Sequence, residues 1–364
     1  MTHSNVERMN RVAWDKDTTK AVIVPNPGRR GPARRRGRHC QLLALLLAMA
    51  APSAMASSDA GDSARLPMTD RGPLNGVIGV PDGWTSAAMP AADISWSVVN
   101  NAVGQQSSHE SLLFDGETQA LVLRAGRRFG RRLSLGLEVP WLSHGGGFLD
   151  RFIDSWHDGL GLDPGIRPEL PTGDLHYSYL RDGVQLLNLQ HQASGLGDLT
   201  TSAAWALAGV DASSKLPLVE LTTDIQWGTG DADDLTGSGS TDIAAGLAVR
   251  APAGGRLGWS LRAGLLWPGA VDAALPAVAG QVYYYEGSLS WRLVPTLDLV
   301  VQVLGHSGTW QSDLKLLGGH SLQLGAGGHW RFGKHFGLRF AVFEDLRVDS
   351  APDFGLELAL AYRP

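Results

Sequence analysis

Serine, histidine and aspartate, the residue types of acyl hydrolysis, occur close together in the middle of this chain. Hydrolysis of this kind needs a nucleophile, a base and an orienting group held in contact with one another. Ser155 and His157 are two residues apart on an expected helix, so they point to different faces, and His109, Ser111 and His144 fall in expected loops. No G-x-S-x-G motif occurs. The sequence therefore favours a protein that is not an enzyme, with a lipid hydrolase as a remote alternative.

Carboxylates in the same region recur at a helical spacing. Asp150, Asp154 and Asp158 are four residues apart, on one face of the expected helix. Like charges at this spacing cost a few tenths of a kcal/mol per pair. Arg151, His157 or a bound hard cation could offset that cost. A solvated stripe is the simpler interpretation, because calcium ligands usually come from a tight loop.

A second acidic cluster lies in the glycine-rich stretch GTGDADDLTGSGS, which contains Asp231, Asp233 and Asp234. This stretch lacks the Gly-Lys-Ser/Thr ending of a phosphate-binding loop. We therefore predict neither a metal ion nor a cofactor.

The three aspartates Asp150, Asp154 and Asp158 belong to a long stretch, 143–195. This stretch interrupts an otherwise regular alternation of short segments and turns. Structureless loops longer than about 12–15 residues are uncommon in compact domains. Apolar residues at helical spacing predict an amphipathic helix within it: Leu149, Phe152, Ile153, Trp156 and Leu160. Three glycines precede this helix, and Gly159, Gly161 and Pro164 end it.

The N-terminal region predicts export from the cytoplasm. Residues 1–28 carry no pattern and are expected to be unstructured. A basic stretch, 29–40, is followed by an apolar run and by Ala54-Met55-Ala56, the order of a secretory signal peptide. The run is too short to span a bilayer, which needs about 20 residues. We assign 1–56 to an N-terminal extension and signal peptide.

Cleavage after Ala56 would leave a cysteine-free and acidic protein. Cys40 is the only cysteine, so disulfides, thiolate metal sites and thiol catalysis are excluded from the mature chain. Cleavage removes ten Lys/Arg and three Asp/Glu and takes the net charge from −5 to −12. Nucleic-acid binding is not expected, because phosphate contacts need Lys and Arg.

The sequence of the mature chain predicts β-strands, because apolar residues alternate with polar or small ones at period two. The segment 133–141 is one example and 354–362 is another. We place about twelve strands near 91–101, 116–128, 132–142, 196–209, 216–228, 240–251, 257–268, 281–293, 297–307, 320–332, 335–346 and 353–363.

Two features indicate that the apolar faces meet lipid. Aromatic residues gather near the strand ends, as in the girdles of a membrane barrel. Charged residues occupy the opposite faces in mid-strand, where Glu138, Arg262, Glu286, Arg339 and Glu357 stand. The expected lengths also suit membrane strands, which need about 9–11 residues. A soluble sandwich remains the alternative to this interpretation.

The connections alternate between short turns and longer loops rich in Gly, Asp and Ser, the pattern of short periplasmic turns and long extracellular loops. The predicted fold is all-β: an antiparallel transmembrane β-barrel of about twelve strands, with one long helix-containing extracellular loop. It occupies 91–364, after a periplasmic N-terminal segment at 57–90. An even strand count places both ends in the periplasm of a Gram-negative bacterium.

Five phrases occur in an order that resembles the bacterial domain-of-unknown-function family 3187. They are DGET (115–118), GGGFLDRFIDSWHDGLGLDPGIR (145–167), GLGD (195–198), WGTGDADDLTGSGSTD (227–242) and EDLRVDSAPDF (344–354). The resemblance runs from about Pro73 to Tyr362. It implies an outer-membrane location and barrel architecture, without an assigned reaction.

The leading function is therefore an outer-membrane channel or transporter for a small or hydrophobic solute, gated or narrowed by 143–195. The alternative is a non-conducting structural or surface-interaction barrel. The expected partners are outer-membrane lipid, lipopolysaccharide and an unknown small solute. Candidate gate or binding residues are Asp150, Arg151, Asp154, Trp156, His157, Arg167, Glu138, Arg262, Glu286, Arg339 and Glu357.

The apolar face of the predicted helix has two surfaces on which to pack. Burial of one large apolar side chain is worth about 1.5–3 kcal/mol, so the face should not remain in water. The helix could lie on the outer leaflet, or it could fold inward over the barrel mouth. We favour inward folding, because the acidic stripe would be repelled by an anionic leaflet.

Overall fold

The computed structural model describes residues 9–14, 21–26, 65–82, 91–161, 165–210, 214–252, 254–271, 275–346, 352 and 354–363. The chain divides into two compact units, residues 1–45 and 46–364. In the first, β1 (Met9–Trp14) pairs antiparallel with β2 (Ala21–Asn26), so the expectation that 1–28 is unstructured is wrong for these strands. The apolar run and cleavage site of the predicted signal peptide lie outside the described residues.

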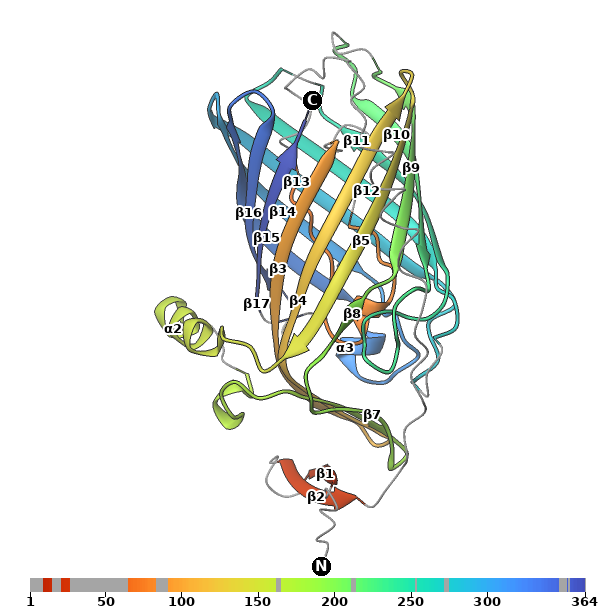
Figure 1. The fold of residues 1–364 in the computed structure, drawn as a ribbon, viewed down its shortest axis with the longest axis vertical. Helices are drawn as coiled ribbons and strands as arrows, with labels where there is room; N and C mark the ends of the chain where they lie inside the picture. Colours follow the sequence, from red (N-terminus) through yellow and green to blue (C-terminus); the bar gives the residue numbers. More distant parts are fainter. Residues whose placement is uncertain are drawn as a thin grey trace, which may run out of the picture. The chain divides into compact units, whose positions relative to one another are not determined.

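Twelve strands of the second unit form a closed antiparallel barrel (Figure 1). Around the ring they are β3 (Ala92–Gln106), β17 (Phe354–Tyr362), β16 (Phe336–Asp345), β15 (Ser321–Phe332), β14 (Leu297–His306), β13 (Val282–Val294), β12 (Leu257–Trp267), β11 (Asp242–Arg250), β10 (Leu218–Trp227), β9 (Leu199–Ala208), β5 (Leu133–Gly145) and β4 (Glu110–Phe129). The pairing of β4 with both β3 and β5 closes the ring. The predicted barrel is confirmed.

The first two barrel strands are longer than predicted. The expected loop 102–115 is strand almost throughout, because β3 and β4 continue together past the barrel rim. There β4 pairs with β6 (His176–Arg181), and β6 pairs with β7 (Val184–Leu189). A further strand, β8 (Ala193–Leu196), pairs with the end of β5. The stretch 143–195 therefore contributes strands as well as a helix.

The outward faces of the barrel strands carry the apolar belt that the period-two pattern predicts. Leu265 is 38% exposed, whereas Arg262 on the opposite face is 4% exposed. Exposed aromatic side chains stand near both ends of the strands: Phe129, Trp205, Trp291, Trp330, Phe336 and Tyr362 at one end, and Trp141, Trp227, Trp267, Tyr283 and Tyr285 at the other. A belt between two aromatic girdles is the outer surface of a membrane-spanning barrel.

Connections differ in length at the two ends of the barrel, as the sequence predicted. Short turns join β4 to β5, β11 to β12, β13 to β14 and β15 to β16 at what we call the short-turn end. The longer loops, including those with α2 (Asp150–Leu160), η2 (Arg167–Glu169) and α3 (Lys315–Gly318), lie at the long-loop end. In the part of the chain that the structure describes, no helix is both long and apolar enough to span a bilayer.

Residues 65–82, which we call the lumen segment, lie inside the barrel. The backbone of Leu66 is hydrogen-bonded to Gln302, in the middle of β14. The short helix η1 (Asn75–Val77) reaches the long-loop end, where Asn75 contacts Thr309 and the carbonyl of Leu316. The chain then returns, and Asp82 contacts β4. The predicted boundary at residue 91 separated 57–90 from the barrel, yet the described part of that segment packs against the barrel interior.

Candidate functional site

The interior of the barrel and the lumen segment together form the candidate site. The segment is attached to the wall by buried charged groups at the level of mid-strand. Arg65 forms an ion pair with Glu286 of β13, and its guanidinium also donates to the carbonyl oxygen of Asp82 at 3.2 Å. Asp82 in turn contacts Arg124 of β4 at 3.0 Å. These contacts tie the two arms of the segment to each other and to opposite sides of the wall.

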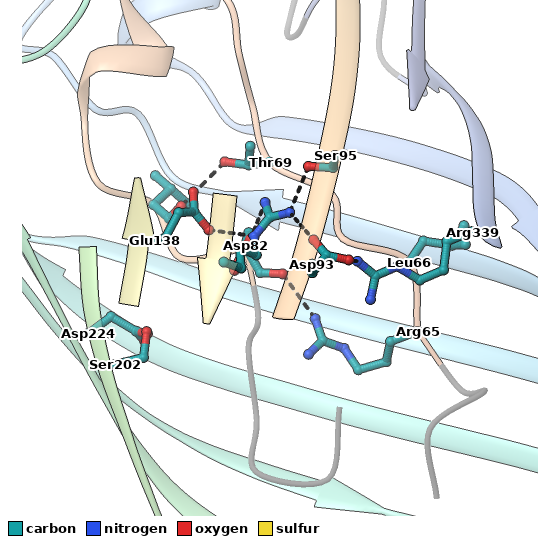
Figure 2. Close-up of polar contacts among 12 residues, drawn as sticks. Arg65, Leu66, Thr69, Asp82, Asp93, Ser95, Glu138, Ser202, Asp224 and Arg339 are labelled. Atoms are coloured by element: carbon teal, nitrogen blue, oxygen red, sulfur yellow. Dashed lines mark hydrogen bonds and ion pairs between the residues drawn. The ribbon is translucent and has the colours of Figure 1, made fainter. Parts of the chain in front are cut away.

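Arg124 is the centre of a buried ion network (Figure 2). Its guanidinium donates to Glu138 at 2.6 Å, to Asp93 at 3.2 Å and to the Ser95 hydroxyl at 2.8 Å. Asp93 also pairs with Arg339, on the far side of Asp93 in Figure 2. A buried charge needs such partners, because an unpaired one costs several kcal/mol. The network thus links β3, β4, β5 and β16 with the lumen segment.

One side of the lumen segment is held by apolar packing. Leu66 and Met68 are buried against Val300 and Phe343 on the inward faces of β14 and β16. Gly325 of β15 permits this approach, because a Cβ atom there would lie 2.3 Å from the Met68 sulfur. Any larger residue at position 325 would have to displace the Met68 side chain.

A hydrophobic core fills the long-loop end. The lumen segment supplies Leu74, Val77, Ile78 and Val80 to it. The β6–β7 hairpin, the inward ends of β11–β13 and the loop after β14 supply further members, among them Tyr177, Tyr179, Leu187, Leu266, Tyr284, Trp310 and Leu317. Close-packed apolar side chains leave little room for water or solute. This core, which we call the mouth core, packs the lumen segment against the barrel strands and the loops at that end.

Polar groups dominate the middle and short-turn half of the interior. Several buried atoms there have no hydrogen-bond partner among the described residues: Ser97 Oγ, Ser134 Oγ, Arg262 Nε, Arg339 Nε and Glu357 Oε1. Buried polar groups in proteins are usually satisfied, often by ordered water. The polar atoms of this half are therefore suited to bind ordered water, whereas the apolar side chains of the mouth core are not.

A cavity of about 60 Å³ lies between the lumen segment and the wall formed by β5, β9 and β10. Hydroxyl, amide and carboxylate side chains line much of it, including Thr69, Glu138, Thr200, Ser202, Asp224 and Gln226. The segment therefore contacts one wall tightly and leaves space beside the other.

The structure divides the predicted site residues into two groups. Glu138, Arg262, Glu286, Arg339 and Glu357 face the interior of the barrel and are buried or half-buried. Arg262 is paired with Asp224 at 2.6 Å, and Glu286 with Arg65. The predicted inward parity of these five residues agrees with the geometry.

The other group, Asp150, Arg151, Asp154, Trp156, His157 and Arg167, lies on or beside α2, outside the ring of strands (Figure 1). Leu149 and Ile153 pack against Val98 and Phe354, which belong to the outward faces of β3 and β17. The favoured inward folding of this helix is therefore wrong. The physical reason is that an apolar patch was already present on the outer wall, nearer to the helix than the mouth.

Polar contacts fix α2 in that position. Asp150 pairs with Arg167 at 3.2 Å and accepts from Asn100 of β3 at 3.1 Å. The Trp156 indole donates to Glu344 of β16 at 3.1 Å. His157 approaches the same carboxylate at 3.7 Å, whereas the Ser155 hydroxyl donates to the carbonyl of Arg151. Ser155 and His157 thus serve different faces, as their spacing predicts.

The acidic residues of the second cluster are engaged within their own loop. Within the described ranges, no three His, Cys, Asp or Glu residues are grouped so that they could hold an ion. The Asp231 carboxylate instead accepts from the backbone amides of Asp233 and Asp234, which shapes its own loop.

Sequence reasoning missed the lumen segment. Its apolar residues follow no single periodicity, because Leu66 and Met68 pack on β14 and β16 whereas Ile78 packs in the mouth core. The one available signal was the number of large apolar side chains in a stretch that had no predicted partner.

Over residues 42–363 the sequence matches a family described as protein of unknown function, DUF3187. This chain belongs to the DUF3187 family. The resemblance that the five phrases indicate is thereby confirmed. No protein with a curated function matches this DUF3187 chain in sequence.

Solved structures similar to this DUF3187 protein are outer-membrane barrels. An outer membrane channel from Pseudomonas putida F1 is 14% identical, with a TM-score of 0.49, over 78% of this chain and 98% of that one. The NanC porin is 8% identical, with a TM-score of 0.43, over 75% and 100%. The Ralstonia pickettii toluene transporter TbuX is 12% identical, with a TM-score of 0.37, over 80% and 97%. At this similarity the likeness carries no argument about solutes.

Proposed function

We propose that this protein is a channel of the bacterial outer membrane for small polar solutes, and that the lumen segment is its gate. The observation that carries the proposal is the position of residues 65–82, which pass through the barrel interior, with its many buried polar groups, and contribute to the mouth core. The apolar belt and its two aromatic girdles support the membrane location.

The contacts between the lumen segment and the barrel wall are of a kind that would allow the segment to move. Side chains, rather than a strand ladder, attach it to the wall, through Gln302, Glu286 and Arg124. Water can replace hydrogen bonds and ion pairs of this kind at modest net cost. Withdrawal of the segment toward the short-turn end would also take four apolar side chains out of the mouth core.

The cavity beside the lumen segment supports a polar solute rather than a hydrophobic one. Its lining is made largely of hydroxyls, amides and carboxylates from β5, β9 and β10. Several of these groups are already paired within the protein, as Glu138 is with Arg124 and Asp224 with Arg262. Their remaining hydrogen-bonding capacity can be used by a small polar solute and not by a hydrophobic one.

The second candidate is a non-conducting structural barrel, and the mouth core favours it. Its members come from many separate parts of the chain, from the lumen segment to the loop after β14, and include fully buried tyrosines such as Tyr177 and Tyr179. If the core stays closed without the lumen segment, the barrel has no continuous path.

Conductance in planar bilayers separates the two functions. We expect the mature protein, residues 57–364, to conduct rarely, and a variant lacking 65–82 to conduct steadily. Retention of the folded, heat-modifiable form in detergent would show that the deletion variant is a closed barrel. A folded deletion variant with no conductance would contradict the channel.

A reversible lock provides the matched control. Met68→Cys combined with Gly325→Cys places two thiols where the segment and β15 are closest, in a mature chain that has no other cysteine. We expect oxidation to abolish the residual openings and reductant to restore them. Met68→Cys alone, which leaves Gly325 in place, should respond to neither treatment.

A further inference from the structure

The outward face of α2 carries an aromatic cluster that the channel function does not use. Phe152 stacks on Trp156, and both rings contact Phe354 of β17, with centroid distances between 5.6 and 6.1 Å. Phe152 remains 48% exposed, and Phe148 just before the helix is 60% exposed. A soluble surface seldom presents several large aromatic side chains together, so this cluster needs a partner.

The helix has three distinct sides, set by its residues three and four apart. Leu149 and Ile153 form the side that packs on the barrel wall. Phe152 and Trp156 form a flank beside that wall. The third side is polar and exposed, and contains Arg151, Asp154, Ser155 and Asp158.

The aromatic flank continues the lipid-facing belt of the barrel. Phe354 is followed on the outward face of β17 by Leu356, which is partly buried in the same cluster, and by Leu358, which is 48% exposed. Trp96 and Val342 on the two neighbouring strands extend the cluster sideways. The apolar surface thus runs without a break from the middle of the barrel to the flank of α2.

We propose that α2 is an interfacial helix whose aromatic flank binds the outer leaflet of the bilayer. A helix of this kind places its apolar face about 5–10 Å into the boundary between headgroups and acyl chains. Trp and Phe suit that boundary, and the polar side then faces water or headgroups. Headgroup phosphates bridged by divalent cations are the lipid chemistry that fits exposed Asp154 and Asp158.

A second copy of the chain is the competing occupant of the flank. Asp154 and Asp158 lie on the side of the helix opposite the flank, so their charges do not decide between lipid and a second copy. Continuity with the belt favours lipid, since the same bilayer that covers Leu358 also reaches Phe354.

Site-specific labels test the proposal in the mature protein, which has no cysteine of its own. Phe152→Cys reports on the flank, Ser155→Cys on the polar side and Leu358→Cys on the belt. Each variant would carry a bimane label and be reconstituted into phosphatidylcholine–phosphatidylethanolamine vesicles with quencher lipids spin-labelled near the headgroup. We expect quenching at 152 to approach that at 358 and to exceed that at 155 several-fold.

Two outcomes would overturn the inference. Quenching at 152 as weak as at 155 would place the flank in water. Spin labels at 152 that broaden each other, and separate on dilution with unlabelled protein, would identify a second copy as the occupant. If Phe152→Cys loosens the helix, Phe148→Cys provides the same readout from the more exposed neighbouring ring.

Discussion

At the scale of single residues, the interior charges act as pairs, and the pair Arg262–Asp224 allows a direct test. Both side chains are buried, and Asp224 also accepts from Ser202 at 2.7 Å. Removal of one partner of a buried pair costs about 3–5 kcal/mol, because the other charge is left uncompensated. We expect Arg262→Met to lower the free energy of unfolding by this amount, measured by urea titration in detergent.

Neutralisation of the partner is the control for that prediction. Arg262→Met with Asp224→Asn should recover much of the loss, since no buried charge remains alone. If the double variant is as unstable as the single one, the loss comes from the contact of the Arg262 guanidinium with the Tyr284 ring, whose centroid lies 5.1 Å from Arg262 Cζ.

A second residue-scale prediction concerns Asp115, on the part of β4 that pairs with β6 beyond the barrel rim. This side chain is 6% exposed. Burial raises the pKa of Asp115 from 3.8 to about 7; the charges of Asp150 and Asp174 also raise it, whereas Arg167 lowers it. The folded form therefore binds the proton more tightly than the unfolded chain.

The sign of the pH effect follows from that difference. Where the folded state holds more protons, the free energy of unfolding falls as pH rises, here between about 4 and 7. We expect hydrogen-exchange protection of β6 and α2, corrected for intrinsic rates, to decrease over this range. Asp115→Asn should flatten the decrease, and Asp158→Asn, at an exposed position, should not. Equal slopes in both variants would contradict the assignment.

At the scale of elements, α2 and the lumen segment both lie away from their predicted positions. The helix covers the outer wall, whereas the segment expected in the periplasm occupies the barrel. Deletion of 148–160 should therefore leave a closed barrel with unchanged conductance, because no barrel strand loses a partner. Planar-bilayer recordings beside the variant lacking 65–82 check this, and an increase in conductance would restore α2 as a gate.

The β6–β7 hairpin is the part of 143–195 that contributes to the mouth core. Tyr177, Tyr179 and Leu187 belong to the mouth core, and the Tyr179 hydroxyl donates to Glu110 of β4 at 2.7 Å. The sequence did not predict this hairpin, because its alternation is short and half of its apolar residues face a core built by distant loops. Within 143–195, the hairpin and not the helix is thus the part placed where a constriction could form.

At the scale of the whole molecule, the two barrel ends predict the orientation in the membrane. The short-turn end should face the periplasm and the long-loop end the exterior. A membrane-impermeant maleimide should label Asp233→Cys, in the loop after β10, on intact cells. It should label Lys334→Cys, in the turn before β16, only after the outer membrane is permeabilised. The reverse labelling pattern would show that the barrel has the opposite orientation, with its short-turn end at the exterior.

The sequence by itself determined the barrel and its parity. Period-two alternation is a local property, so each strand and its lipid-facing side could be assigned from its own residues. The length of the connections then set the two ends. Glu138, Arg262 and Glu286 could be placed in the interior for the same reason.

Only the tertiary structure decided what fills the barrel and where the helix lies. Leu66 meets Gln302 across 236 positions of sequence, and Ile153 meets Phe354 on a strand at the other end of the chain. Neither contact could be predicted from periodicity. Periodicity shows which side of an element is apolar, and does not show which distant surface will cover that side. The amphipathic pattern predicted that α2 would be buried on one side; the position of Val98 and Phe354 decided which surface it covered.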